Sequence, residues 1–199
     1  MKKFLTIISF IIIITMPISA KTLKGSVSLD WDGLSQTEIT QDIENVRGIV
    51  FSKELSDFDK QEFKNQIKPH KKDKNKVENY MLASSGGGEL SDKIIVPFFY
   101  KKYLYAYGII YKNDLKTCYY YNAFGGLYQI EYLEKDYGTF PVVSYQYNKK
   151  GALSAAVYNI SDVDQYMYKT DKKFAGRWYK ENYYNGSGKV IMTRTLPEK

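Results

Sequence analysis

One pattern of polar and apolar residues recurs through the second half of the chain. Two tyrosines separated by one residue are followed by a polar residue, a short turn and then an apolar residue. The pattern occurs at residues 119–127, 145–153 and 166–174, and in a degraded form at 183–190. Because alternate side chains of a strand share a face, each tyrosine pair projects from one side of a strand. The pattern therefore predicts a series of consecutive β-hairpins.

The turns within the pattern carry the residues that hairpin corners require. Residues 148–151 (Asn-Lys-Lys-Gly) place Asn first, where its side chain can bond the backbone two residues on, and Gly last, where φ must turn positive. This order is typical of a type I turn with a G1 bulge. Residues 122–125 and 185–188 repeat it, whereas residues 169–172 lack both Asn and Gly. The returning strands are predicted to begin six residues after the second tyrosine, at Leu127, Leu153, Phe174 and Val190.

Two further strands are predicted before the repeats. Residues 101–112 carry tyrosines at alternate positions 103, 105 and 107, which places them on one face, and the apolar run 94–100 suits a hairpin partner. Pro97 predicts that this run is an edge strand or contains a bulge, because proline cannot donate to a sheet ladder. The unequal spacing of the repeats favours one twisted antiparallel meander over a solenoid, whose units stack in fixed register.

The region before the sheet follows a helical period. Ser35 and Glu38 form a capping box, and residues 57–67 predict a second short helix that must end before Pro69. The apolar positions of the first helix are Ile39, Ile43, Val46 and Val50. A meander cannot bury both faces alone, so we expect these helices to pack on one face of the sheet. Residues 84–88 (Ser-Ser-Gly-Gly-Gly) predict a flexible joint.

The predicted fold class is therefore α+β, with N-terminal amphipathic helices packed on a C-terminal antiparallel β-meander of hairpin repeats. The predicted organisation is a signal peptide at 1–20, a helical region at 21–92 and a tyrosine-rich antiparallel sheet at 93–199, with residues 21–199 forming one domain.

The amino terminus has the pattern of a secretory signal. Lys2 and Lys3 precede an uncharged apolar run, Phe4–Met16, and residues 17–20 offer a helix break and a small residue for cleavage before Lys21. The apolar run is shorter than the roughly 20 residues of a bilayer span, which favours cleavage over a retained anchor. We therefore expect an exported protein, periplasmic or secreted, with no transmembrane helix after cleavage.

Two repeat families resemble parts of residues 100–194. The pattern Tyr-x-Tyr-Asn-x-x-Gly-x-Leu resembles the tyrosine–aspartate repeats of bacterial Rhs-type exported proteins, with Asn where that family prefers Asp. Residues 176–179 (Gly-Arg-Trp-Tyr), followed by residues 184–189 (Tyr-Asn-Gly-Ser-Gly-Lys), are similar to the variant MORN repeat of bacterial antitoxin-like proteins. The resemblance implies β-hairpin architecture and a role in protein or envelope association. It supplies no catalytic residues.

Charge bears on the choice of partner. Residues 101–199 carry 15 basic and 9 acidic side chains, whereas residues 21–100 carry 12 and 13. A basic, tyrosine-rich sheet favours an envelope glycopolymer, lipid head groups or another protein, although lysines that keep the sheet soluble explain the same charge. Nucleic acid is not expected, because no RNP-type pattern accompanies the tyrosines. The candidate binding residues are Tyr103, Tyr105, Tyr121, Tyr147, Tyr168, Arg177 and Trp178.

Reactive groups are sparse. One histidine, His70, and one cysteine, Cys118, cannot make the usual zinc spacings and give little support to Ser–His or Cys–His chemistry. Cys118 lies between Thr117 and Tyr119 in a predicted strand, where it fits a small buried hydrophobe. No cofactor, metal ligand or catalytic residue is predicted.

The expected function is that of a non-catalytic binding or interaction module of the bacterial envelope whose ligand is unknown. One alternative is a small envelope hydrolase that uses scattered carboxylates such as Glu131, Glu134 and Asp136, because the separation of such groups in space is invisible in a sequence. The other is a structural periplasmic protein without a small ligand.

Overall fold

The computed structural model describes residues 36–194, and their side chains from residue 38 onward. The described residues contain three α-helices, a short 3-10 helix and eleven strands. The helices come first: α1 (Gln36–Val50), α2 (Lys60–Ile67), η1 (Lys68–His70) and α3 (Lys76–Ser84). The predicted signal peptide and Ser35 of the predicted capping box lie outside the described residues.

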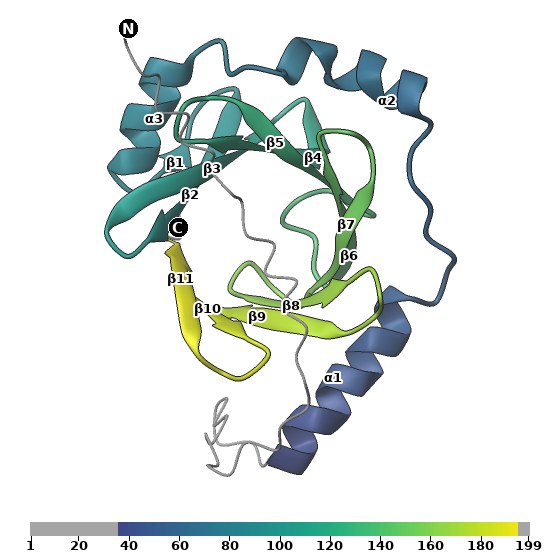
Figure 1. Cartoon of the computed structure of the whole chain (residues 1–199). Coiled ribbons are helices and arrows are strands. Elements are labelled where there is room, and N and C mark those ends of the chain that lie inside the picture. The colour runs from purple at the N-terminus through teal and green to yellow at the C-terminus, as the bar shows by residue number, and fades with distance from the viewer. Residues whose placement is uncertain (1–35, 195–199) are drawn as a thin grey trace, which may run out of the picture.

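The strands pair in the order of the chain and then close on themselves. Each strand from β2 to β11 is antiparallel to the next, and β11 pairs with β2, so these strands form a closed barrel to which β1 is added along β2 (Figure 1). The strands are β1 (Gly88–Glu89), β2 (Lys93–Tyr100), β3 (Tyr103–Tyr111), β4 (Asp114–Asn122), β5 (Leu127–Leu133), β6 (Val142–Asn148), β7 (Leu153–Asn159), β8 (Asp164–Lys169), β9 (Phe174–Tyr179), β10 (Asn182–Asn185) and β11 (Val190–Arg194).

Helices packed on an antiparallel sheet are confirmed, but the open meander is a wrong prediction. A twisted sheet of this many strands curls, and pairing its first strand with its last removes both exposed edges. The pairing joins Thr193 to Phe99, which are 94 residues apart in the chain. A local sequence pattern carries no signal for such a distant contact.

The four predicted hairpin corners share one geometry, and all four returning strands begin where the sequence predicts. In each corner the second tyrosine pairs with the first residue of the returning strand, directly after a shift of register that marks a bulge. The pairs are Tyr121–Leu127, Tyr147–Leu153, Tyr168–Phe174 and Tyr184–Val190. The predicted turn with a bulge is therefore confirmed.

Asparagine supports three of these corners from its side chain. The Oδ1 atoms of Asn122, Asn148 and Asn185 each accept hydrogen bonds from the backbone N–H groups two and four residues on. The fourth corner starts at Lys169 and makes the same backbone hydrogen bonds without this support. There Lys172 takes a φ of +64°, at the position where the other corners have glycine.

Strand β2 departs from its prediction as an edge strand. It pairs with β3 on one side, and on the other with β1 at Ile94 and Ile95 and with β11 at Phe98 and Phe99. Pro97 pairs with Tyr107 of β3 and lies between these two partners, so its missing N–H interrupts no ladder with β1 or β11. The bulge beside it, at the register shift between Phe98 and Phe99, has its additional residue in β3 and not in this run.

The helices lie around the outside of the ring of strands (Figure 1). Helix α1 packs over β7 and β8, and α3 packs over β2 and β3. The predicted apolar face of α1 is confirmed, since Ile39, Val46 and Val50 are buried. Helix α2 begins at Lys60 and not at Asp57, because Asp59 caps it by accepting hydrogen bonds from the N–H groups of residues 61 and 62.

Helix α3 was not predicted from the sequence. Its most exposed apolar residues are Val77 and Met81, whereas Asn79 and Ala83 are buried against the barrel. The hydrophobic period therefore did not mark the buried face. The residues that predicted a flexible joint instead end α3 and begin β1. A Cβ on Gly87 would lie 2.4 Å from the carbonyl oxygen of Ile95, so the backbone at this joint passes close against β2.

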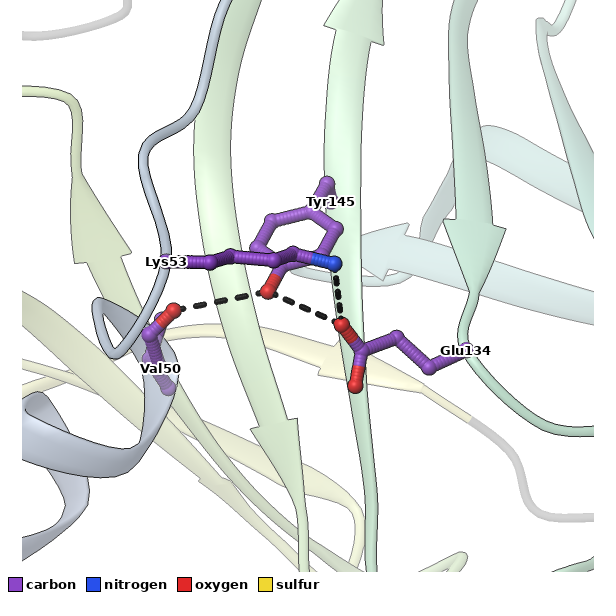
Figure 2. Close-up of polar contacts among 4 residues, drawn as sticks. All are labelled: Val50, Lys53, Glu134 and Tyr145. Carbon is purple, nitrogen blue, oxygen red and sulfur yellow. Dashed lines mark hydrogen bonds and ion pairs between the residues drawn. The ribbon is translucent and has the colours of Figure 1, made fainter.

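A small group of polar contacts fixes the segment between α1 and α2 to the barrel (Figure 2). Lys53 forms an ion pair with Glu134 and lies 4.6 Å from the centre of the Tyr145 ring. The Tyr145 hydroxyl lies 3.2 Å from Glu134 Oε1 and 3.4 Å from the carbonyl oxygen of Val50. Burial and the neighbouring Glu134 raise the pKa of Tyr145 above its ordinary value near 10, so the hydroxyl keeps the proton that it donates.

Candidate functional site

A cavity of about 440 Å³ lies inside the barrel. Its volume falls within the range of roughly 300–1,000 Å³ that is usual for pockets that bind small molecules. Its walls are mostly apolar, with aliphatic side chains such as Val96, Ile110, Leu133, Val157 and Met167. Aromatic rings make up much of the remainder: Phe98, Tyr105, Tyr120, Tyr128, Tyr137, Phe140 and Trp178.

The repeated tyrosine pattern positions this cavity in a simple way. The two outer tyrosines of each pattern are buried between the barrel and the helices, and the residue between them lines the cavity. In β4, β6 and β8 these middle residues are Tyr120, Gln146 and Met167. The strands thus present tyrosine to the helices and a more varied set of side chains to the interior.

A buried carboxylate with several hydrogen-bond partners lies in the cavity wall. Glu131 of β5 is 7% exposed and accepts hydrogen bonds from the Tyr120 hydroxyl and from Ser144 Oγ. Gln146 Nε2 donates a third hydrogen bond at 3.2 Å. Asn159 Nδ2 donates to Ser144 Oγ at 3.0 Å, which directs the single Ser144 proton toward Glu131.

The geometry leaves Glu131 with capacity for one more partner. A carboxylate has about four acceptor positions, two on each oxygen. Oε2 accepts from Tyr120 and Gln146, whereas Oε1 accepts from Ser144 alone among the described residues. Within residues 36–194 no ion pair involves Glu131. A ligand that brings an N–H or O–H donor, or a positive charge, would therefore complete the contacts of this side chain.

Arg194 of β11 places a positive charge in the same cavity. Its guanidinium donates to Gln165 Oε1 at 3.0 Å and to the carbonyl oxygens of residues 162 and 180, and it lies 4.8 Å from the Trp178 ring centre. Burial lowers the pKa of Arg194 to about 10, so the side chain remains charged at neutral pH. Neutral acceptors thus hold a charged group in the cavity wall.

Cys118 of β4 also lines the cavity, directly opposite Glu131 in the β4–β5 pair. It is buried, as the sequence predicts. Burial and the nearby Glu131 raise the pKa of the Cys118 thiol well above its ordinary value. The thiol is therefore protonated at neutral pH, which makes it a weak nucleophile.

The structure does not bring the predicted binding residues together on one face. Tyr121, Tyr147 and Tyr168 are buried in the core between barrel and helices. Tyr105 and Trp178 line the cavity, whereas Tyr103 is 67% exposed near a hairpin tip. Arg177 is buried and forms a two-point contact with Asp164 at 2.6 and 2.7 Å.

The prediction that the tyrosines at 103, 105 and 107 share one face is wrong. Phe98 pairs with Ala106 and Phe99 pairs with Leu104, so Tyr105 is the additional residue of a bulge. Tyr105 consequently lines the cavity, while the hydroxyl of Tyr107 donates to Asp73 outside the barrel.

Sequence reasoning considered Glu131 only as one of several scattered carboxylates and missed Ser144, Gln146 and Asn159. The available signal was the pair of polar residues, Ser144 and Gln146, that alternate with the tyrosines of β6. If β6 is taken to be buried on both faces, this alternation indicates that the face opposite the tyrosines meets a polar interior of the barrel.

The carboxylates of the alternative hydrolase do not meet. Glu131 lies in the cavity wall, Glu134 is bound to Lys53 on the outside of the barrel, and Asp136 is exposed. Within residues 36–194 no group of three or more histidine, cysteine, aspartate or glutamate side chains is arranged to hold a metal ion.

A second, polar cavity of about 500 Å³ lies on the outside of the barrel beside η1 and α3. Asp73 is its best-connected group, since it accepts from the Tyr107 hydroxyl and from Asn79 Nδ2. His70 stacks on Tyr119 with ring centres 3.9 Å apart. Burial, with a further contribution from Lys74, lowers the pKa of His70 below its ordinary value near 6.5.

Comparisons with known protein families, with curated proteins and with solved structures found no match to this chain. Across residues 36–194, none of the helices combines the length and the apolar character needed to cross a lipid bilayer.

Proposed function

We propose that this protein is a non-catalytic binding module that takes a small, mostly apolar molecule into the interior of its barrel. The observation that carries the proposal is the aromatic-walled cavity with Glu131 in its wall. The apolar walls favour a ligand with an apolar framework, because burying its apolar surface stabilises the complex by about 25 cal/mol per Å². The open acceptor position on Glu131 favours a donor or cationic group on that framework.

The proposed place of action is the bacterial envelope, reached through the amino-terminal signal. A binding role is favoured over hydrolysis by these three carboxylates because Glu131 lines the cavity whereas Glu134 pairs with Lys53 outside the barrel and Asp136 is exposed, and glycoside cleavage requires two carboxylates that flank one substrate. The protonated Cys118 thiol is likewise poorly suited to nucleophilic catalysis.

The first test asks whether the interior takes up an apolar probe. N-phenyl-1-naphthylamine, which fluoresces in apolar surroundings, is titrated into the protein. Val157→Trp fills the cavity, and Val190→Trp adds the same bulk at an exposed position. We expect saturable binding that Val157→Trp weakens at least tenfold and Val190→Trp leaves unchanged. Equal binding by the two variants would show that the probe binds elsewhere.

The single cysteine provides a second readout that requires no substitution. Methyl methanethiosulfonate is added in large excess, because the protonated Cys118 thiol, which lines the cavity, is expected to react slowly. We expect saturating probe to slow this reaction several-fold. A reaction rate that is independent of the probe contradicts the proposal even if Val157→Trp fails to fold.

The role of Glu131 is tested with two ligands of matched shape. 1-(Aminomethyl)naphthalene carries a protonated amine, whereas 1-methylnaphthalene does not. We expect Glu131→Gln to weaken binding of the amine about tenfold or more, since charged hydrogen bonds are worth about 1.5–3 kcal/mol. The neutral compound should bind the variant as before, which also shows that the variant is folded. An equal loss for both compounds would remove Glu131 from the recognition of the polar group.

A further inference from the structure

The topology of the barrel sorts its connections into two ends. Because β2 to β11 run alternately up and down, every second connection lies at the same end. The turn end consists of residues 101–102, 123–126, 149–152, 170–173 and 186–189. The opposite end consists of residues 112–113, 134–141, 160–163 and 180–181.

The two ends differ strongly in charge. The opposite end is nearly neutral, with three lysines (residues 112, 135 and 180) and four acidic residues (134, 136, 162 and 181). The turn end carries one acidic residue, Asp171, and seven lysines, all of them exposed: Lys101, Lys102, Lys149, Lys150, Lys172, Lys173 and Lys189.

The few acidic groups near the turn end do not cancel this charge. Asp171 forms an ion pair with Lys173. Asp57, from the segment before α2, approaches the β6–β7 turn by accepting the N–H of Leu153. Six of the seven lysines at this end therefore form no ion pair with a carboxylate of residues 38–194.

Exposed aromatic rings accompany the lysines. Phe124, in the β4–β5 turn, is 80% exposed, and Tyr100 and Tyr103 flank the β2–β3 turn at 52% and 67% exposure. Lys101 and Lys102 lie over the rings of Tyr100 and Tyr103, at 5.7 and 5.8 Å from the ring centres. Aromatic rings beside lysines are typical of protein surfaces that lie at the head-group level of a membrane.

We propose that the turn end docks on an anionic lipid bilayer, with its lysines against the head groups and Phe124 inserted between them. Charge complementarity explains the lysines, and a lipid surface, unlike a soluble polyanion, also explains the exposed Phe124. This proposal does not depend on the cavity ligand, since the surface is defined by the turns alone.

Docking in this orientation fits the closure of the cavity. Four residues of the opposite end, Tyr137, Phe140, Asp162 and Val163, line the cavity, so the longer connections fold over that end. Of the described residues in the turn end, none lines the cavity. The turn end can therefore meet the lipid without contact between the lipid and the opposite-end residues that line the cavity.

The first experiment measures binding of the full chain to vesicles by sedimentation. Phosphatidylcholine vesicles are compared with vesicles that contain phosphatidylglycerol as well, at low ionic strength. Lys149→Gln/Lys150→Gln alters the turn end, and Lys135→Gln/Lys180→Gln removes the same charge from the opposite end. The amino-terminal apolar run is common to all variants, so its contribution is the same in each.

We expect the chain to bind the anionic vesicles more tightly than the neutral ones. The turn-end pair should weaken this binding about 30-fold, from about fivefold per lysine, and the opposite-end pair less than threefold. Salt should weaken binding of the wild type and of the opposite-end pair more than that of the turn-end pair. Equal losses for the two pairs, or equal binding to neutral and anionic vesicles, would overturn the proposal.

The second experiment locates the contact. Phe124→Trp places a fluorescent reporter at the turn end, and Ile160→Trp places one at an exposed position of the opposite end. Because the chain already contains Trp31 and Trp178, the emission of each added tryptophan is taken as the difference from the wild-type spectrum. We expect anionic vesicles to shift the emission of the tryptophan at position 124 to shorter wavelength and to leave that of the tryptophan at position 160 unchanged. Lysine-dependent binding to dextran sulfate without a shift of the Phe124→Trp emission on vesicles would assign the surface to a soluble polyanion and reject the lipid. The cavity assays contain no vesicles, so the two proposals fail independently.

Discussion

At the scale of single residues, the tyrosines of the sheet occupy three different surroundings. Tyr168 is fully buried and donates to the carbonyl oxygen of Ile43 in α1 at 2.7 Å, Tyr120 donates to Glu131 in the cavity wall, and Tyr103 faces solvent. Their strand positions follow from the sequence, but their surroundings depend on which face the helices cover. No residue-level propensity decides that.

His70 makes stability depend on pH. Because burial lowers the pKa of the folded state below the unfolded value near 6.5, the unfolded chain binds the proton more readily. The contribution of neutral His70 to stability is therefore present above pH 6.5 and is lost as pH falls from 6.5 through the lower folded pKa. His70→Phe retains an aromatic stack on Tyr119 and removes the titration.

The measurement is urea denaturation of both proteins at several pH values from 7.5 to 5.5. We expect the difference in unfolding free energy between wild type and His70→Phe to change in favour of the variant as pH falls. The carboxylates titrate equally in both proteins and cancel. A difference that stays constant over this range would place His70 in a solvated environment in solution.

At the scale of elements, the hairpins were the most predictable part of the chain because each is specified locally. Asn and Gly fix the corner, the tyrosine pair fixes the strand, and all four returning strands begin where the sequence placed them. Helix α3 failed for the converse reason. Its buried face is Asn79 and Ala83, and that face is defined by partners elsewhere in the chain.

The corner at Lys169 offers a test of this local specification. It lacks the asparagine whose Oδ1 accepts two backbone hydrogen bonds at the other corners. Asp171 Oδ1 already accepts from the N–H of Lys173 in this corner. We expect Lys169→Asn to raise the unfolding free energy by about 0.5–1 kcal/mol, measured by urea denaturation, because it supplies an acceptor for the N–H of Asp171. Lys150→Asn, in a corner where Asn148 already has this role, is the control and should change little. If Lys169→Asn lowered the unfolding free energy, the methylene groups of Lys169 would contribute more to stability than the new side-chain acceptor.

At the scale of the whole molecule, the main apolar core lies between the barrel and the helices. Ile39, Val50 and Phe63 from the helical segments meet Ile130 and Tyr168 from the strands there, while the interior of the barrel is a cavity. The sequence predicted the partners of this core. It did not predict that β11 pairs with β2 to close the barrel. Because an open sheet has no interior, Ser144, Gln146 and Asn159 could not be recognised as a group.

Two leucines of β5 allow the core side and the cavity side of the barrel wall to be compared. Leu127 belongs to the buried core cluster, and Leu133 lines the cavity. We expect Leu127→Ala to cost about 2–4 kcal/mol of unfolding free energy, because it leaves a new void in a filled region. Leu133→Ala should cost about 1 kcal/mol, since its side chain already borders empty space. Thermal and urea denaturation of both variants check this, and equal costs would indicate a collapsed interior.

The repeated corners have one more consequence. Each holds its backbone through the first and last residues of the turn and through the tyrosine beside it, while the side chains of Lys149 and Lys150 between them take no part in these hydrogen bonds, to which Lys150 contributes only its backbone N–H. Substitutions at these turn positions can therefore accumulate without disturbing the strands. A few solvent-facing replacements could thus change the charge of one end of the barrel and leave its interior unaltered.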